Sequence, residues 1–160
     1  MREQLEGYHD LVSGNEIFLN RVKGVGRYDA QTAIAYSLSG ANLRCTGVKW
    51  DLRKNEPYSI YDRFDFDIPV ETDGDVYARY KVRMAEIAQS LNILEQAVEQ
   101  IPAEGPFMAK VPRIPKPPEG ETYVRIESPR GEIGCHIISK GKPQPYRIKF
   151  RRPSFYNLQI

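Results

Sequence analysis

Charged side chains stand among apolar ones in the stretch from residue 39 to residue 69. Arg44, Asp51 and Arg53 have apolar neighbours in the chain, namely Leu43, Val48, Trp50 and Leu52. A charge that is taken out of water costs several kcal/mol unless it is paired. The pattern therefore allows two interpretations: a polar site that lines a cavity, or a buried ion-pair network that holds an irregular loop. The energetics favour the network and leave the polar site open.

Histidine and cysteine show no spacing that is typical of a catalytic or metal site. His136 follows Cys135 in an alternating run, where successive side chains point to opposite faces of a strand, so the two cannot form a nucleophile and base pair. Cys45 lies far from Cys135 and outside any CxxC pattern, and His9 belongs to no motif. We therefore expect no catalytic residue, no metal site and no disulfide framework.

The composition is that of one domain without a strong charge. The chain has 160 residues, of which 41% are hydrophobic, and a formal net charge of +2. This balance gives no electrostatic argument for a nucleic-acid partner. No apolar run approaches the roughly 20 residues of a membrane-spanning helix, and the first ten residues lack the apolar core of a signal peptide. Any membrane association must therefore come through a partner protein.

Helical signals fill the first part of the chain. Residues 3–22 have a partial apolar face that is broken at Ser13 and Gly14, and residues 30–39 predict a second helix. The clearest element runs from about 75 to 101, where apolar residues recur every three or four positions on one face: Val76, Tyr80, Met84, Ile87, Leu91, Leu94, Val98 and Ile101. The other predicted helices are short, so this long stripe has too few partners within the chain.

Proline and alternating patterns divide the second part of the chain. Residues 102–120 are rich in proline and predict an extended, semi-rigid arm. Alternating runs at 122–128, 134–140 and 146–150 predict a small antiparallel β meander from about 122 to 150. The fold class is therefore α+β, a partial helical bundle plus a meander. We expect a single partial domain over 1–160, with a helical part at 1–101 that includes an irregular loop at 40–70, the arm, and a β part at 121–160.

Three long blocks of the sequence resemble, in order, successive parts of one family. They lie at residues 24–70, 74–97 and 123–160, and they contain GVGRYDAQ, LRCTGVKWDLRKNEPYSIYD and YVRIESPRGEIG. The resemblance is to the D subunit of the bacterial proton-pumping NADH:quinone oxidoreductase, respiratory complex I. It covers nearly the whole chain and depends on long blocks rather than on one short pattern.

The resemblance implies a fold like that of the [NiFe]-hydrogenase large subunit and a place in the peripheral arm of complex I. The implied partners are the iron-sulfur subunit, the neighbouring peripheral-arm subunit, the membrane subunit of the quinone channel, and quinone itself. NAD and quinone are then used by the complex and iron-sulfur clusters lie in neighbouring subunits, while no cofactor binds this chain directly. The implied location is peripheral, at the cytoplasmic side of the cell membrane.

The resemblance also sets limits on activity. Family members are more than twice as long, and the blocks that carry their quinone-contacting His and Tyr have no counterpart here. We therefore expect an internal fragment of a redox translocase that is inactive alone, in which Arg44, Asp51 and Arg53 support the quinone region. Two alternatives stay open: a segment of a membrane-bound [NiFe]-hydrogenase large subunit, and a purely structural or interaction module.

Overall fold

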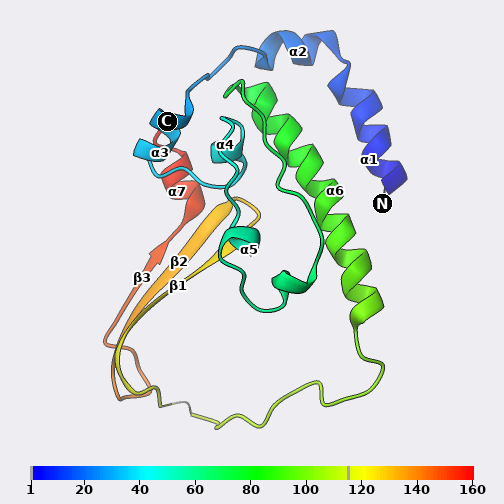
Figure 1. Cartoon of the computed structure of the whole chain (residues 1–160). Helices are drawn as coiled ribbons and strands as arrows, with labels where there is room; N and C mark the ends of the chain where they lie inside the picture. The colour runs from blue at the N-terminus through cyan, green and yellow to red at the C-terminus, as the bar shows by residue number, and fades with distance from the viewer. Residues whose placement is uncertain (1, 115) are drawn as a thin grey trace.

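The chain forms a helical part and a three-stranded sheet, joined by a long connection whose described residues form neither helix nor strand (Figure 1). The computed structural model describes residues 2–114 and 116–160. The helices are α1 (Arg2–Tyr8), α2 (Glu16–Val22), α3 (Ala30–Ala35), α4 (Ala41–Arg44), α5 (Leu52–Asn55), α6 (Val76–Gln100) and α7 (Pro153–Asn157). The strands are β1 (Glu119–Ser128), β2 (Gly131–Lys140) and β3 (Arg147–Arg151). The expected α+β class is confirmed.

Helix α6 is the long helix that the apolar stripe predicts. Asp75 caps its first turn, because its carboxylate accepts hydrogen bonds from Ala78 N at 2.7 Å and from Gly24 N at 2.7 Å. Pro102 follows directly after Ile101, where the helix has ended. In the first half of α6, Ala78 and Val82 are buried against α4. In its second half, Leu94 and Val98 are exposed.

The predicted helix at 3–22 is present in two pieces. Helix α1 continues into a π-helical turn at His9–Ser13, and α2 begins after Gly14. Asn15 caps α2, because its Oδ1 accepts hydrogen bonds from Ile17 N at 2.9 Å and from Phe18 N at 3.2 Å. The predicted helix at 30–39 is shorter than expected, since α3 ends at Ala35 and Ser37 has a positive φ of 56°.

The irregular stretch between residues 40 and 70 contributes to the core. It contains α4, α5 and a 3₁₀ turn at Tyr61–Arg63. Five of its apolar side chains are buried although the backbone is mostly irregular: Leu43, Leu52, Phe64, Phe66 and Ile68. Figure 1 shows α4 and α5 between α6 and the sheet, so this stretch connects the two parts of the fold.

The strands form an antiparallel meander in the order β1-β2-β3, as expected. Strand β1 begins at Glu119, three residues before the predicted start and within the last two residues of the predicted arm. One sheet face carries Arg125 and Glu127, which contact the helical part. The opposite face carries Val124, Ile126 and Phe150, which are exposed. Helix α7, after β3, was not predicted.

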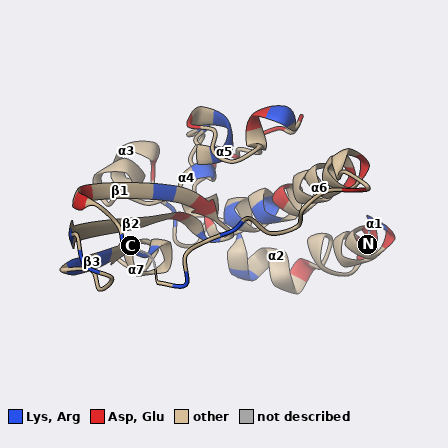
Figure 2. Cartoon of the chain, turned by 90° about the horizontal axis from the view of Figure 1, so that it is seen from below, with Lys and Arg blue, Asp and Glu red and all other residues tan. Residues whose placement is uncertain are grey.

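None of the helices in the described residues is long and apolar enough to cross a membrane. Lys and Arg side chains concentrate in the first half of α6, at Arg79, Lys81 and Arg83, whereas its last turns carry Glu95 and Glu99 (Figure 2). This order is opposite to the one that the helix dipole favours. Ion pairs offset part of the cost, since Lys81 pairs with Glu71 and Glu95 pairs with Arg2.

Candidate functional site

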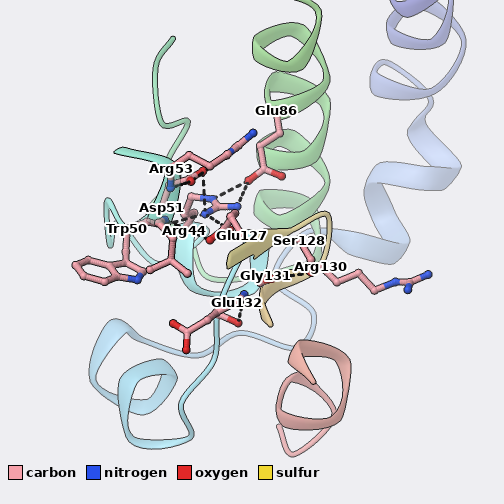
Figure 3. A network of polar contacts seen from close by, with 12 residues as sticks. Arg44, Trp50, Asp51, Arg53, Glu86, Glu127, Ser128, Arg130, Gly131 and Glu132 are labelled. Atoms are coloured by element: carbon pink, nitrogen blue, oxygen red, sulfur yellow. Dashed lines mark hydrogen bonds and ion pairs between the residues drawn. The ribbon is translucent and has the colours of Figure 1, made fainter. Parts of the chain in front are cut away.

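Arg44, the last residue of α4, lies at the centre of a buried cluster of charges between α5, α6 and the end of β1 (Figure 3). Its side chain is 3% exposed. It donates from Nε to Glu86 Oε1 at 2.7 Å, and from Nη1 to Glu127 Oε1 at 3.0 Å and to the Trp50 carbonyl at 2.8 Å. Asp51 is the third carboxylate, with its Oδ2 3.6 Å from Arg44 Nη1. We call Arg44, Asp51, Arg53, Glu86 and Glu127 the charge cluster.

Arg53 completes the charge cluster through a two-point contact with Asp51. Its Nε and Nη2 donate to the two carboxylate oxygens of Asp51 at 3.0 Å and 2.7 Å. Asp51 also caps α5, since its Oδ1 accepts a hydrogen bond from Arg53 N at 2.9 Å. The guanidinium of Arg53 lies over the ring of Phe66, 5.1 Å from its centroid. The guanidinium of Arg53 is therefore held by the Asp51 carboxylate and by the Phe66 ring.

The pKa values show that the buried charges compensate one another. Burial alone would raise the pKa of Asp51, but the hydrogen bonds and charge of Arg53, with the charge of Arg44, hold it below its ordinary value of 3.8. Burial would likewise lower the pKa of Arg44, but three neighbouring carboxylates outweigh that effect and raise it. Both groups are therefore charged at neutral pH.

The turn between β1 and β2 positions Glu127 through close backbone packing. Gly131 has a positive φ of 119°, and a Cβ added there would lie 2.5 Å from Ser39 Oγ. Ser39 Oγ accepts a hydrogen bond from Glu132 N at 3.1 Å. On the other side, Asn157 of α7 donates to the Arg130 carbonyl at 3.0 Å and to the Ser39 carbonyl at 3.3 Å. The turn is thus held against the segment that leads into α4.

A pocket of about 400 Å³ opens beside the charge cluster. Its wall includes four members of the cluster, Arg44, Arg53, Glu86 and Glu127, together with Tyr61 and Arg83. The wall contains charged groups of both signs, although apolar surface makes up the larger part of its lining. In the described residues, no group of three or more His, Cys, Asp or Glu side chains is arranged to hold a metal ion.

The structure brings all three predicted site residues together. Arg44 and Asp51 form the expected buried ion pair, and Arg53 shares Asp51. Arg44 and Arg53 also border a pocket, whereas Asp51 does not line it, so the two interpretations of the sequence are not exclusive. Glu86 and Glu127 were missed. A weak signal for Glu127 exists, because it follows Ile126 in an alternating run and precedes the Pro-Arg-Gly turn.

The architecture is that of an α+β chain in which a buried charge cluster joins helices to a sheet. Comparison with known proteins shows the family to which the chain belongs. The model for the family described as "Respiratory-chain NADH dehydrogenase, 49 Kd subunit" matches residues 1–118 and 111–160. The chain belongs to this family.

Several curated relatives carry the name of the D subunit of NADH-quinone oxidoreductase. The chain is 76% identical over 160 residues to the one from Bacillus mycoides (strain KBAB4), 76% identical to the one from Bacillus anthracis, and 73% identical to the one from Geobacillus thermodenitrificans (strain NG80-2). In each case the match covers 100% of this chain and 44% of the relative. The chain thus spans less than half the length of the relatives that it matches.

Proposed function

We propose that this chain is part of the quinone-reducing peripheral-arm subunit of NADH:quinone oxidoreductase. The observation that carries the proposal is the 76% identity, over every residue of the chain, to a protein named as the D subunit of NADH-quinone oxidoreductase. In this role the chain serves electron transfer from NADH through iron-sulfur clusters to quinone, coupled to proton translocation. The names of the relatives favour this function over the large subunit of a [NiFe]-hydrogenase.

The proposed role of the chain in the complex is support rather than chemistry. Arg44, Asp51 and Arg53 hold α4, α5 and the end of β1 together, and so fix a pocket wall that carries charges of both signs. Two-point pairing and burial make such a contact rigid. We propose that this rigidity supports the quinone region. The chain itself binds no cofactor, and its partners are the iron-sulfur subunit, a neighbouring peripheral-arm subunit and the membrane subunit of the quinone channel. The location is peripheral, on the cytoplasmic side of the cell membrane.

A chimera tests the proposal in a complete complex. Residues 2–160 replace the matching segment of the D subunit from Geobacillus thermodenitrificans, which is 73% identical. The chimera is expressed in a strain that lacks its own copy of this protein. We expect membranes from this strain to recover quinone reduction by NADH, because the segment supplies the same packing and the same charge cluster. A chimera that assembles into the complex but leaves quinone reduction at the level of the deletion strain contradicts the proposal.

Two variants of the chimera separate support of the quinone region from general folding. Arg44→Ala removes the centre of the charge cluster and should lower both the amount of assembled complex and quinone reduction per complex. Lys142→Ala changes an exposed residue in the β2–β3 connection and should leave both unchanged. If Arg44→Ala lowers only the amount of complex, the charge cluster is structural and its proposed role near quinone is wrong.

A further inference from the structure

The charge cluster contains one more acid than base. Its three carboxylates are Asp51, Glu86 and Glu127, and its two guanidiniums are Arg44 and Arg53. With all five groups ionised the cluster therefore carries one net negative charge. Three of the side chains are almost fully buried, with exposed fractions of 3% for Arg44, 2% for Asp51 and 4% for Glu127. An excess charge in such a place is costly, and binding one proton removes it.

Glu127 is the acid that can lose its charge at the lowest cost. Asp51 has two guanidinium partners and accepts a backbone hydrogen bond at 2.9 Å. Glu86 is 17% exposed and makes the closest contact with Arg44, at 2.6 Å. Among the described residues, Glu127 forms a direct ion pair with one guanidinium, that of Arg44 at 3.0 Å, and its second oxygen accepts a long hydrogen bond from Leu52 N at 3.4 Å. If Glu127 becomes neutral, Arg44 still contacts two carboxylates.

Arg53 is close enough for its charge to interact with that of Glu127, but its direct ion pair is with Asp51. On β2, Glu132 lies directly opposite Glu127 in the strand register, and like charges in that position repel. Glu132 has its own partners in Arg125 and Arg151. The Tyr58 hydroxyl contacts the backbone of Glu127 rather than its carboxylate.

Two further groups reach the same space from other elements. Arg83 on α6 and Tyr61 in the 3₁₀ turn line the pocket beside Glu127. Arg83 hydrogen-bonds to Asn42 Oδ1, at 3.2 Å. Burial is the main cause that raises the pKa of Glu127 above its ordinary value of 4.5, and the charge of Asp51 adds to it. Arg44 and the Leu52 amide offset only part of this rise.

Glu127 also lines the pocket of about 400 Å³, which gives it a path to water. We propose that the Glu127 carboxyl is a proton-binding site that is loaded and emptied through this pocket. The proton binds to a carboxylate oxygen of Glu127, which converts the carboxylate to a carboxylic acid and the net charge of the cluster from −1 to zero. Proton release reverses both changes. This inference goes beyond the proposed function and does not depend on it.

Infrared spectroscopy of the isolated wild-type chain tests the proposal without quinone or other subunits. The carbonyl stretch of a neutral carboxyl group is separate from the bands of a carboxylate, so a pH titration counts neutral carboxyls directly. We expect one carboxyl band to persist as the pH rises through the range in which exposed glutamates ionise. If the wild-type chain shows no neutral carboxyl above that range, the proposal is wrong.

Three variants assign the band. Glu127→Gln should remove it, whereas Glu99→Gln, which changes an exposed glutamate on α6, should leave it unchanged. Glu86→Gln should shift its midpoint to lower pH, because Arg44 then interacts with one acid fewer. Circular dichroism checks that each variant is folded. A band that persists in folded Glu127→Gln, or a midpoint that stays unmoved in Glu86→Gln, overturns the assignment to Glu127. The Glu86→Gln result decides the question even if Glu127→Gln does not fold.

Discussion

Arg44 is stable in the interior because its guanidinium has a charged or carbonyl partner on every side. Removal of that side chain leaves buried acids without their shared partner, and a carboxylate isolated in this way costs far more than an exposed one. A buried ion pair is seldom a strong net source of stability, but its disruption is strongly destabilising. The effect of substitution therefore measures the burial of the partners more than the strength of any single contact.

We expect Arg44→Ala to lower the free energy of unfolding by about 3–5 kcal/mol, the usual cost of breaking a buried pair by removing one partner. Urea denaturation monitored by circular dichroism measures the change. The matched control is Arg83→Ala on α6, whose exposed guanidinium donates to Asn42 Oδ1 and to a backbone carbonyl. That change should stay within about 0.5 kcal/mol. Equal losses in the two variants would show that Arg44 is not the centre of a buried cluster.

Asp51 should contribute to the free energy of unfolding at neutral pH, and this contribution should be lost in acid. Its folded-state pKa is below 3.8, so folding favours the ionised form. The contribution of Asp51 is therefore present above the unfolded pKa and lost as the pH falls through the lower, folded-state pKa. In thermal melts between neutral pH and strong acid, the melting temperature of Asp51→Asn should fall less steeply with decreasing pH than that of the wild type. Asp73→Asn, at an exposed position, serves as the control. If the melting temperature of Asp51→Asn falls with decreasing pH as steeply as that of the wild type, the prediction is wrong.

At the scale of elements, the sequence predicted the helix and strands that have a regular hydrophobic period. It did not predict close contacts between distant parts of the chain. The stripe of α6 and the alternation of the strands recur over many residues, so the ends of α6 were predicted to within one residue and those of the strands to within three. Helix α7 was missed because it is one turn long and has no repeating pattern. The close approach of Gly131 to Ser39 also has no local signal, because the two residues are far apart in the chain.

That close approach makes Gly131 the glycine to test. We expect Gly131→Ala to destabilise the chain, because the new Cβ would lie 2.5 Å from Ser39 Oγ in addition to the strain of a positive φ. Gly105→Ala is a matched control, since Gly105 also has a positive φ, of 143°, but has nothing within 4 Å of the added Cβ. Thermal melts should show the larger loss for Gly131→Ala. A loss no greater than that of Gly105→Ala would mean that the turn can move away from Ser39.

The cap of α6 is a second test at this scale. Asp75→Ala removes the acceptor for two backbone amides: that of Ala78, within the helix, and that of Gly24, in the turn after α2. Loss of an N-cap side chain typically costs about 1 kcal/mol, and we expect at least that loss in urea denaturation. Asp73→Ala, two residues earlier and exposed, should cost much less. Equal effects would show that the carboxylate of Asp75 contributes nothing specific.

For the molecule as a whole, the sequence predicted some members of the charge cluster but not the partners that distant parts of the chain supply. Arg44, Asp51 and Arg53 could be identified because apolar residues flank them within a dozen positions. Glu86 and Glu127 lie 42 and 83 residues from Arg44, and only the fold brings them to it. The charge cluster therefore depends on the docking of α4 against both α6 and β1. It can serve as a direct probe of whether the helical part and the sheet are assembled.

The exposed apolar surface gives the last prediction. Val98 on α6 is 71% exposed and Phe150 on the sheet is 52% exposed, and both have apolar neighbours on the same face. Exposed apolar residues on these two faces promote association. We expect the isolated chain to self-associate with increasing concentration in analytical ultracentrifugation. Val98→Lys should weaken association, whereas Gln100→Lys adds the same charge nearby without removing apolar area and should have little effect. A wild-type chain that stays monomeric at every concentration would show that this surface is too small to drive association.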